Sequence, residues 1–149
     1  MKTLRNFLLF GFAAFMLLNS GCKKYEEGPV FSLRSKKARV VNDWMVVKFY
    51  KNGEEQDLEN TTIEIVYKDD NTGVEKYTIS STFGTHTVEF NFKWDFNSDK
   101  TKLLVTYLDD DGNEEEDVED YLILRLKENE LWLEGQDGDD KYELHLEPK

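Results

Sequence analysis

Strict alternation of apolar and polar side chains runs through Val88-Glu89-Phe90-Asn91-Phe92-Lys93-Trp94-Asp95-Phe96. Five apolar side chains occupy every second position, and polar residues occupy the positions between them. Alternate side chains of a β-strand point to opposite faces of a sheet, whereas a helix repeats about every 3.6 residues. The pattern therefore predicts a strand near residues 86–96 with one apolar and one polar face.

The chain beyond residue 43 consists of similar short runs separated by turn residues. Turns are predicted at Asn52-Gly53, Asn71-Thr72-Gly73, Asn97-Ser98-Asp99, Asp111-Gly112-Asn113, Glu128-Asn129 and Asp137-Gly138. Asn-Gly and Asp-Gly accommodate the positive φ that tight hairpins require, so sequential strands are expected to pair antiparallel. Eight strands are predicted, near residues 43–50, 62–68, 74–80, 86–96, 102–108, 116–127, 130–135 and 141–147.

Eight short strands joined by hairpins predict an all-β domain over residues 43–149. The expected architecture is an eight-stranded antiparallel up-and-down barrel, because closure removes the exposed edges that an open meander would leave. A sandwich of two sheets is the alternative. The barrel requires the first and last strands to pair with each other.

The first 18 residues have the features of a secretion signal. Lys2 and Arg5 precede an apolar run of 12 residues from Phe7 to Leu18, which is too short to cross a bilayer as a resident helix. A cleaved signal peptide is therefore predicted at residues 1–21, and it implies export to the cell envelope.

A single cysteine, Cys22, follows this leader, so no disulfide forms within the chain. The motif Ser20-Gly21-Cys22 resembles the lipobox of bacterial lipoproteins, in which the cysteine is acylated and becomes the first residue of the mature chain. The resemblance implies lipidation of Cys22 and membrane attachment through its acyl chains. The alternative is an ordinary cleaved signal followed by an incidental cysteine.

Charge is distributed unevenly over the predicted mature chain. Residues 22–149 carry 17 basic and 31 acidic side chains, a net charge of −14, which excludes a nucleic-acid partner. Residues 22–39 have a net charge of +4, whereas residues 40–149 have a net charge of −18. Residues 22–42 are therefore predicted to be a basic tether, which either contacts anionic lipid headgroups or is a solvated linker.

Trp44 lies at the entrance of the first predicted strand, ahead of an eight-stranded meander. This arrangement resembles the lipocalin and calycin pattern, in which the indole plugs one end of the barrel. The segments Cys22–Pro29 and Ser32–Arg39, together with Trp44 and the ending from Glu130 to Glu147, are similar to those of small lipocalin-like lipoproteins of Bacteroidota. The resemblance implies a lipocalin-like barrel, a lipid-anchored outer-membrane location and the binding of a small apolar molecule.

The residue types that carry catalysis and metal binding are sparse. His86 and His145 are the only histidines, and neither has a sequence-near nucleophile or carboxylate arranged as a catalytic triad. The acidic runs at residues 109–117 and 137–140 are candidate calcium sites, because calcium prefers clustered carboxylates, but no helices are predicted on either side of them as in an EF-hand. Solvated hairpin tips are the favoured interpretation, and no enzyme activity, metal or cofactor is predicted.

Aromatic and aliphatic side chains give the strongest candidate site. The residues predicted to line the barrel are Trp44, Val46, Phe90, Phe92, Trp94, Leu104, Leu122, Leu124 and Leu144. They either surround a cavity for an apolar guest or fill the interior themselves, and large inward rings favour filling.

The predicted function is that of a non-catalytic, lipid-anchored envelope protein that binds a small hydrophobic or amphipathic molecule. In the alternative, a solid barrel contacts another envelope protein through its acidic surface.

Overall fold

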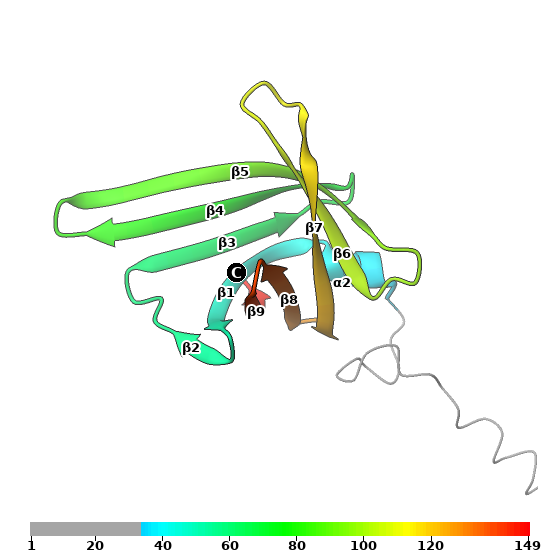
Figure 1. Ribbon diagram of the computed structural model, residues 1–149, viewed down its shortest axis with the longest axis horizontal. Helices are drawn as coiled ribbons and strands as arrows, with labels where there is room; N and C mark the ends of the chain where they lie inside the picture. Colours follow the sequence, from blue (N-terminus) through cyan, green and yellow to red (C-terminus); the bar gives the residue numbers. More distant parts are fainter. Residues whose placement is uncertain (1–33) are drawn as a thin grey trace, which may run out of the picture.

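A computed structural model describes residues 34–149 (Figure 1). The predicted signal peptide, Cys22 and the first part of the predicted tether lie outside the described residues. The elements are α2 (Lys36–Val40), β1 (Asn42–Lys51), β2 (Glu54–Gln56), β3 (Thr61–Tyr67), β4 (Thr72–Ser81), β5 (Gly84–Phe96), β6 (Lys102–Leu108), β7 (Glu114–Leu126), β8 (Leu131–Asp137) and β9 (Asp140–Pro148). All eight predicted strands are present, and the sequence analysis missed only the three-residue β2.

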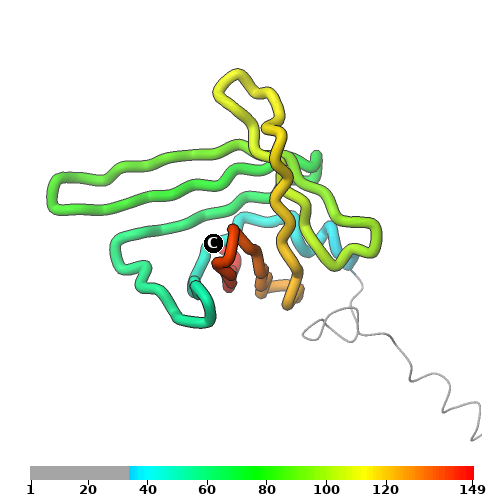
Figure 2. Tube along the Cα trace, in the orientation of Figure 1, coloured from blue at the N-terminus to red at the C-terminus, as the bar shows by residue number. Residues whose placement is uncertain are grey.

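The strands form one closed antiparallel sheet. Its hydrogen-bonded order is β2-β1-β3-β4-β5-β6-β7-β8-β9, and a further pairing of β1 with β9 closes the barrel. That pairing runs from Trp44 opposite Pro148 to Lys51 opposite Tyr142, and Figure 2 shows the first and last long strands lying side by side there. The predicted up-and-down barrel is confirmed, and the two-sheet sandwich is excluded.

Helix α2 covers one end of the barrel, which we call the closed end. Ser35 caps the helix by accepting a hydrogen bond from the Ala38 amide at 3.0 Å. Val40 and Trp44 are fully buried, and the Trp44 indole Nε1 donates to the Val40 carbonyl at 2.8 Å. Arg39, also buried, donates to the Leu126 carbonyl at 2.7 Å. The last residues of the predicted tether are therefore part of the folded body.

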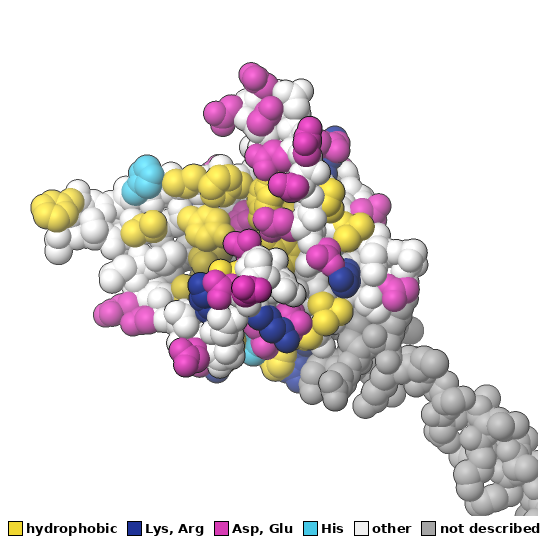
Figure 3. All heavy atoms as spheres, viewed as in Figure 1, with side chains coloured by type: hydrophobic (Ala, Val, Ile, Leu, Met, Phe, Trp, Pro, Cys, Tyr) yellow, Lys and Arg dark blue, Asp and Glu magenta, His cyan; other side chains and the backbone are white. Residues whose placement is uncertain are grey.

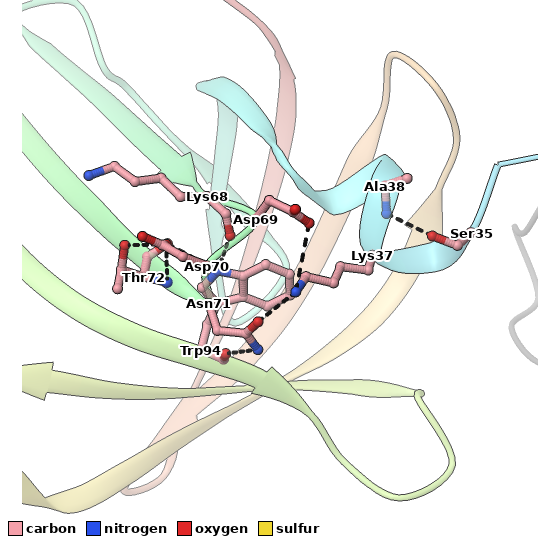
Figure 4. A network of polar contacts seen from close by, with 9 residues as sticks. All are labelled: Ser35, Lys37, Ala38, Lys68, Asp69, Asp70, Asn71, Thr72 and Trp94. Carbon is pink, nitrogen blue, oxygen red and sulfur yellow. Dashed lines mark hydrogen bonds and ion pairs between the residues drawn. The ribbon is translucent and has the colours of Figure 1, made fainter.

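The β3–β4 turn fastens the helix to the sheet (Figure 4). Asn71 adopts a positive φ of 66° in this turn, and its side-chain oxygen accepts a hydrogen bond from Lys37 Nζ at 2.6 Å. The Asn71 amide nitrogen donates to the Trp94 carbonyl at 3.0 Å. The Trp94 indole in turn donates to the Lys68 and Thr72 carbonyls at 3.2 and 3.1 Å. One asparagine thus connects α2, the turn and β5.

Two hairpins extend beyond the opposite, open end of the barrel (Figure 1). Strand β5 pairs with β6 only from Phe92 to Phe96, so residues 84–91 pair with β4 alone. The β6–β7 hairpin carries the acidic run 109–117, whose tip is organised by Asp109 accepting hydrogen bonds from the Asp111 and Asn113 amides at 3.0 and 2.8 Å. Within residues 34–149, no helix has the length and hydropathy of a transmembrane span.

Candidate functional site

The barrel interior is largely filled by side chains. A cavity of about 20 Å³ remains near the open end, which is enough for about one water molecule. Its walls are Ile65, Tyr67, Glu75, Phe92, Val105, Tyr107, Tyr121, Leu133 and Leu144. A drug-sized ligand needs a pocket of about 300 Å³ or more, so this cavity does not enclose one.

Five of the predicted lining residues occupy the interior. Trp44, Val46, Phe92 and Trp94 are buried in the core, and Leu144 is half-buried against it and lines the cavity. Phe90 belongs to the same face, because it lies opposite the cavity residue Glu75 in the β4–β5 register. It lies beyond the closed part of the barrel, however, and remains 44% exposed.

Leu104 was expected to face inward, but the structure places it on the outer face of β6. Its neighbours Leu103 and Val105 are buried and lie opposite Phe96 and Trp94 of β5. Cross-strand partners share a face of the sheet, so Leu103 and Val105 point inward together with Phe96 and Trp94, and Leu104 points outward. Apolar residues occupy both faces of β6, so alternation within this strand alone does not reveal which face is buried.

Leu122 and Leu124 also depart from the predicted lining. A bulge shifts the β7–β8 register between Ile123 and Arg125, so Ile123 and Leu126 are the buried residues of this part of β7. Both predicted leucines are only half-buried. A bulge adds one residue to one strand and so reverses the alternation after it, which breaks the period-two reading of Leu122, Leu124 and Leu126.

The principal polar group of the interior is Glu75 on β4, which is not among the predicted lining residues. This residue is 8% exposed and lines the cavity. The Tyr77 hydroxyl donates to Oε1 at 2.6 Å, and the Tyr107 hydroxyl donates to Oε2 at 2.5 Å. Burial and the charge of Glu75 raise the pKa of both tyrosines, so both hydroxyls remain protonated donors at neutral pH.

A second carboxylate lies near this cluster on β7. Glu119 lies opposite the buried Val105 and therefore shares the inner face, although it is exposed. It accepts a hydrogen bond from the Tyr121 hydroxyl. Burial and this hydrogen bond raise the pKa of Tyr121. The open end thus combines two carboxylates with neutral tyrosines.

An apolar strip continues from the open end along the β4–β5 hairpin (Figure 3). Tyr77, Ile79, Val88 and Phe90 alternate with polar residues and share the inner face through the Tyr77–Val88 register pair. We call these four residues the shelf. Phe90 makes edge contacts with Tyr77 and Tyr107, at centroid distances of 6.0 and 6.3 Å, which connect the shelf to the Glu75 cluster.

The two histidines lie outside the interior. His86 is exposed on the β4–β5 hairpin. His145 stacks on Trp132 at a centroid distance of 3.9 Å and hydrogen-bonds Glu143 at 2.6 Å. Residues 34–149 contain no group of three or more His, Cys, Asp or Glu side chains arranged to hold a metal ion.

Comparisons with known proteins identify similar barrels but no family. No protein-family model and no curated protein matches the chain. A solved bovine odorant binding protein in complex with a selenium-containing odorant has a TM-score of 0.48 and 12% identity, covering 81% of this chain and 77% of its own. Lobster apocrustacyanin A1 has a TM-score of 0.47 and 16% identity, covering 74% and 61%.

The bovine lipocalin allergen Bos d 2 has a TM-score of 0.45 and 10% identity, covering 76% of this chain and 75% of its own. Identities this low carry no information about shared function. The barrel itself is established by the register of its strands, above all by the pairing of β1 with β9.

A signal for Glu75 was present in the sequence. Tyr77 and Ile79 form a predicted period-two pair, and extending that pair by two residues toward the N-terminus places Glu75 on the same face. Only the register of β4 with β5 and of β5 with β6 shows that this face also carries Tyr107.

Proposed function

We propose that the protein is a non-catalytic, lipid-anchored envelope protein that binds a small hydrophobic or amphipathic molecule at the open end of its barrel. The observation that carries this proposal is the shelf, whose side chains are apolar yet solvent-accessible. Ile79, Val88 and Phe90 are 49%, 37% and 44% exposed. They continue the apolar inner face of the barrel without a break in alternation.

The guest lies along the shelf, because the interior cavity of about 20 Å³ is too small to enclose it. Covering apolar surface is favourable by roughly 25 cal/mol per Å². Exposed apolar side chains that form a contiguous strip are typical of binding surfaces, whereas scattered ones are not. The shelf therefore supplies affinity, and the polar groups beside it orient the guest.

The anchor and location form part of the same proposal. Ser20-Gly21-Cys22 supports acylation of Cys22, and the apolar leader supports export. Several acyl chains on one residue give durable attachment at about 0.8 kcal/mol per buried methylene. The basic residues Lys23 and Lys24 beside Cys22 would lie near the lipid headgroups of the envelope, with the acidic body held away from them.

The binding site is tested with octanol, a neutral amphiphile, by isothermal titration calorimetry of the purified protein. A double variant, Val88→Ser with Phe90→Ser, is expected to lose at least about tenfold in affinity, or about 1.4 kcal/mol. The matched control is Thr87→Ser, which alters the opposite face of the same strand. Unchanged binding by the double variant, or no binding by the native chain, would refute a site on the shelf.

The anchor is tested by fractionating cells that express the native chain or Cys22→Ala. The native protein is expected in the membrane fraction and the variant in the soluble fraction. Membrane association that survives the substitution would contradict acylation at this residue.

A second candidate function is contact with another envelope protein through the acidic surface. The β6–β7 hairpin, which projects from the barrel (Figure 1), favours it, because Asp109–Asp111 and Glu114–Asp117 place seven exposed carboxylates around its tip. Chemical cross-linking in intact cells is expected to join this hairpin to a basic partner, and Glu115→Gln with Glu116→Gln to reduce the yield. An unchanged yield would remove this candidate.

A further inference from the structure

Glu75 is a buried carboxylate whose partners in the described residues are two neutral hydroxyl groups. Tyr77 and Tyr107 each occupy one carboxylate oxygen. No ion pair of residues 34–149 includes Glu75. Burying a charge is costly unless a countercharge compensates it, and hydrogen bonds from hydroxyls compensate only in part. The site therefore has unused capacity for a cation.

Geometry also leaves room for one. A carboxylate accepts about four hydrogen bonds, and Glu75 accepts two from protein groups. The cavity that Glu75 lines has a volume of about 20 Å³, close to the size of one water molecule. A primary ammonium group is of similar size and donates up to three hydrogen bonds. A bulkier quaternary ammonium does not fit this space.

We propose, building on the ligand site proposed above, that the guest is an amphipathic primary amine. Its ammonium head occupies the cavity and pairs with the carboxylate of Glu75, and its apolar tail lies along the shelf. Phe90 is the connecting residue, since it lies opposite Glu75 in the register and contacts both Tyr77 and Tyr107. The shelf therefore begins beside Glu75, to which the shelf residue Tyr77 donates a hydrogen bond.

The surrounding charge favours a cation over an anion. Glu119 brings a second carboxylate to the inner face near the cavity. The body from residue 40 to 149 has a net charge of −18, which attracts cations and repels carboxylates and phosphates. An aromatic wall adds cation–π attraction, because Phe92, Tyr107 and Tyr121 all line the cavity.

The test compares three probes of equal chain length by isothermal titration calorimetry with the purified protein at neutral pH. Octylammonium is cationic, octanol is neutral and octanoate is anionic. Octylammonium is expected to bind at least about tenfold more tightly than octanol, and octanoate more weakly than either. Equal affinity for octylammonium and octanol would overturn the ammonium proposal while leaving a ligand site on the shelf intact.

Substitution of Glu75 separates a specific pair from general attraction to an acidic protein. Glu75→Gln keeps the side-chain shape and is expected to abolish the preference for octylammonium while retaining octanol binding. Glu89→Gln is the matched control, because it removes the same charge from a residue that is exposed and paired with Lys76 at 3.4 Å. It is expected to retain the preference.

A second variant protects the test against failure of Glu75→Gln to fold. Tyr77→Phe removes one hydroxyl donor and leaves the carboxylate in place, so the preference for octylammonium is expected to persist or increase. Loss of the preference in Tyr77→Phe would assign cation binding to the tyrosine and overturn the role of Glu75. Failure of all three probes to bind the native chain would instead refute the ligand site itself.

Discussion

Tyr107 donates a hydrogen bond to the carboxylate of Glu75 across the open end of the barrel, at 2.5 Å and over a separation of 32 residues in the sequence. Strand β5 lies between the two strands that carry these residues. The contact therefore forms only when β4, β5 and β6 are in register. This hydrogen bond holds the Glu75 carboxylate beside Tyr107, which also contacts Phe90 of the shelf.

The buried tyrosines are expected to make stability depend on alkaline pH. Burial raises the pKa of Tyr67, Tyr77, Tyr107 and Tyr121 above the ordinary value of 10.0. The folded state thus holds the phenolic proton more tightly than the unfolded state. The stabilisation is fully present below pH 10 and is lost as the pH rises through the folded-state pKa.

Urea unfolding at several pH values between 8 and 12 measures this effect. Each such tyrosine lowers the free energy of unfolding by up to about 1.4 kcal/mol per pH unit above pH 10. Tyr107→Phe is expected to show a shallower decline than the native chain. A decline of equal slope in this variant would contradict the contribution of Tyr107.

Gly73 on β4 is expected to tolerate no side chain. A Cβ there would lie 2.2 Å from the Phe92 ring and 2.6 Å from the Val66 carbonyl oxygen. Gly73→Ala should destabilise the fold by about 3 kcal/mol, because the Val66 carbonyl belongs to the backbone of a paired strand and cannot move away as a side chain could. Thermal unfolding measures the loss, and adding Phe92→Leu should recover only the part caused by the ring.

Asn71 has two separable roles in the β3–β4 turn. Asn71→Gly keeps the positive φ and loses the side-chain hydrogen bonds to Lys37 and Trp94, at a cost of about 1–2 kcal/mol. Asn71→Ala loses the same hydrogen bonds and, unlike the glycine variant, keeps a Cβ in the left-handed region, where alanine lacks the polar side chain that makes this conformation tolerable for asparagine. It should therefore cost about 1 kcal/mol more than Asn71→Gly. In chemical denaturation, the native chain should therefore have the highest free energy of unfolding, followed by Asn71→Gly and then by Asn71→Ala. The reverse order of the two variants would contradict these two roles.

Truncating two phenylalanines of the β4–β5 hairpin should change the free energy of unfolding by very different amounts. Phe92 is 2% exposed, and Phe92→Ala is expected to cost about 3–5 kcal/mol through the cavity that it leaves. Phe83 lies fully exposed at the hairpin tip, and Phe83→Ala is expected to stay within about 0.5 kcal/mol of the native chain. Thermal melts of the two variants compare them directly, and a large loss in Phe83→Ala would show that the tip is packed.

Local pattern was sufficient for most of the fold. The short alternating runs and the turn residues between them placed all eight long strands. Period two in a strand and positive φ in a turn are properties of neighbouring residues, so they are legible without a partner strand. The sequence favoured closure, because pairing the two edge strands removes exposed edges, but only the observed pairing of β1 with β9 excluded the two-sheet sandwich.

Tertiary structure alone assigned faces and contacts where the local pattern was ambiguous or interrupted. Leu104 lies in a strand that is apolar on both faces, and a bulge shifts the alternation after Ile123. The meeting of Glu75 with Tyr107 likewise depends on the stagger of three strands. Register is set by the summed packing of a whole sheet, whereas sequence periodicity reports one strand at a time. The strands and part of the barrel lining could therefore be predicted from the sequence, whereas the contact of Glu75 with Tyr107 could not.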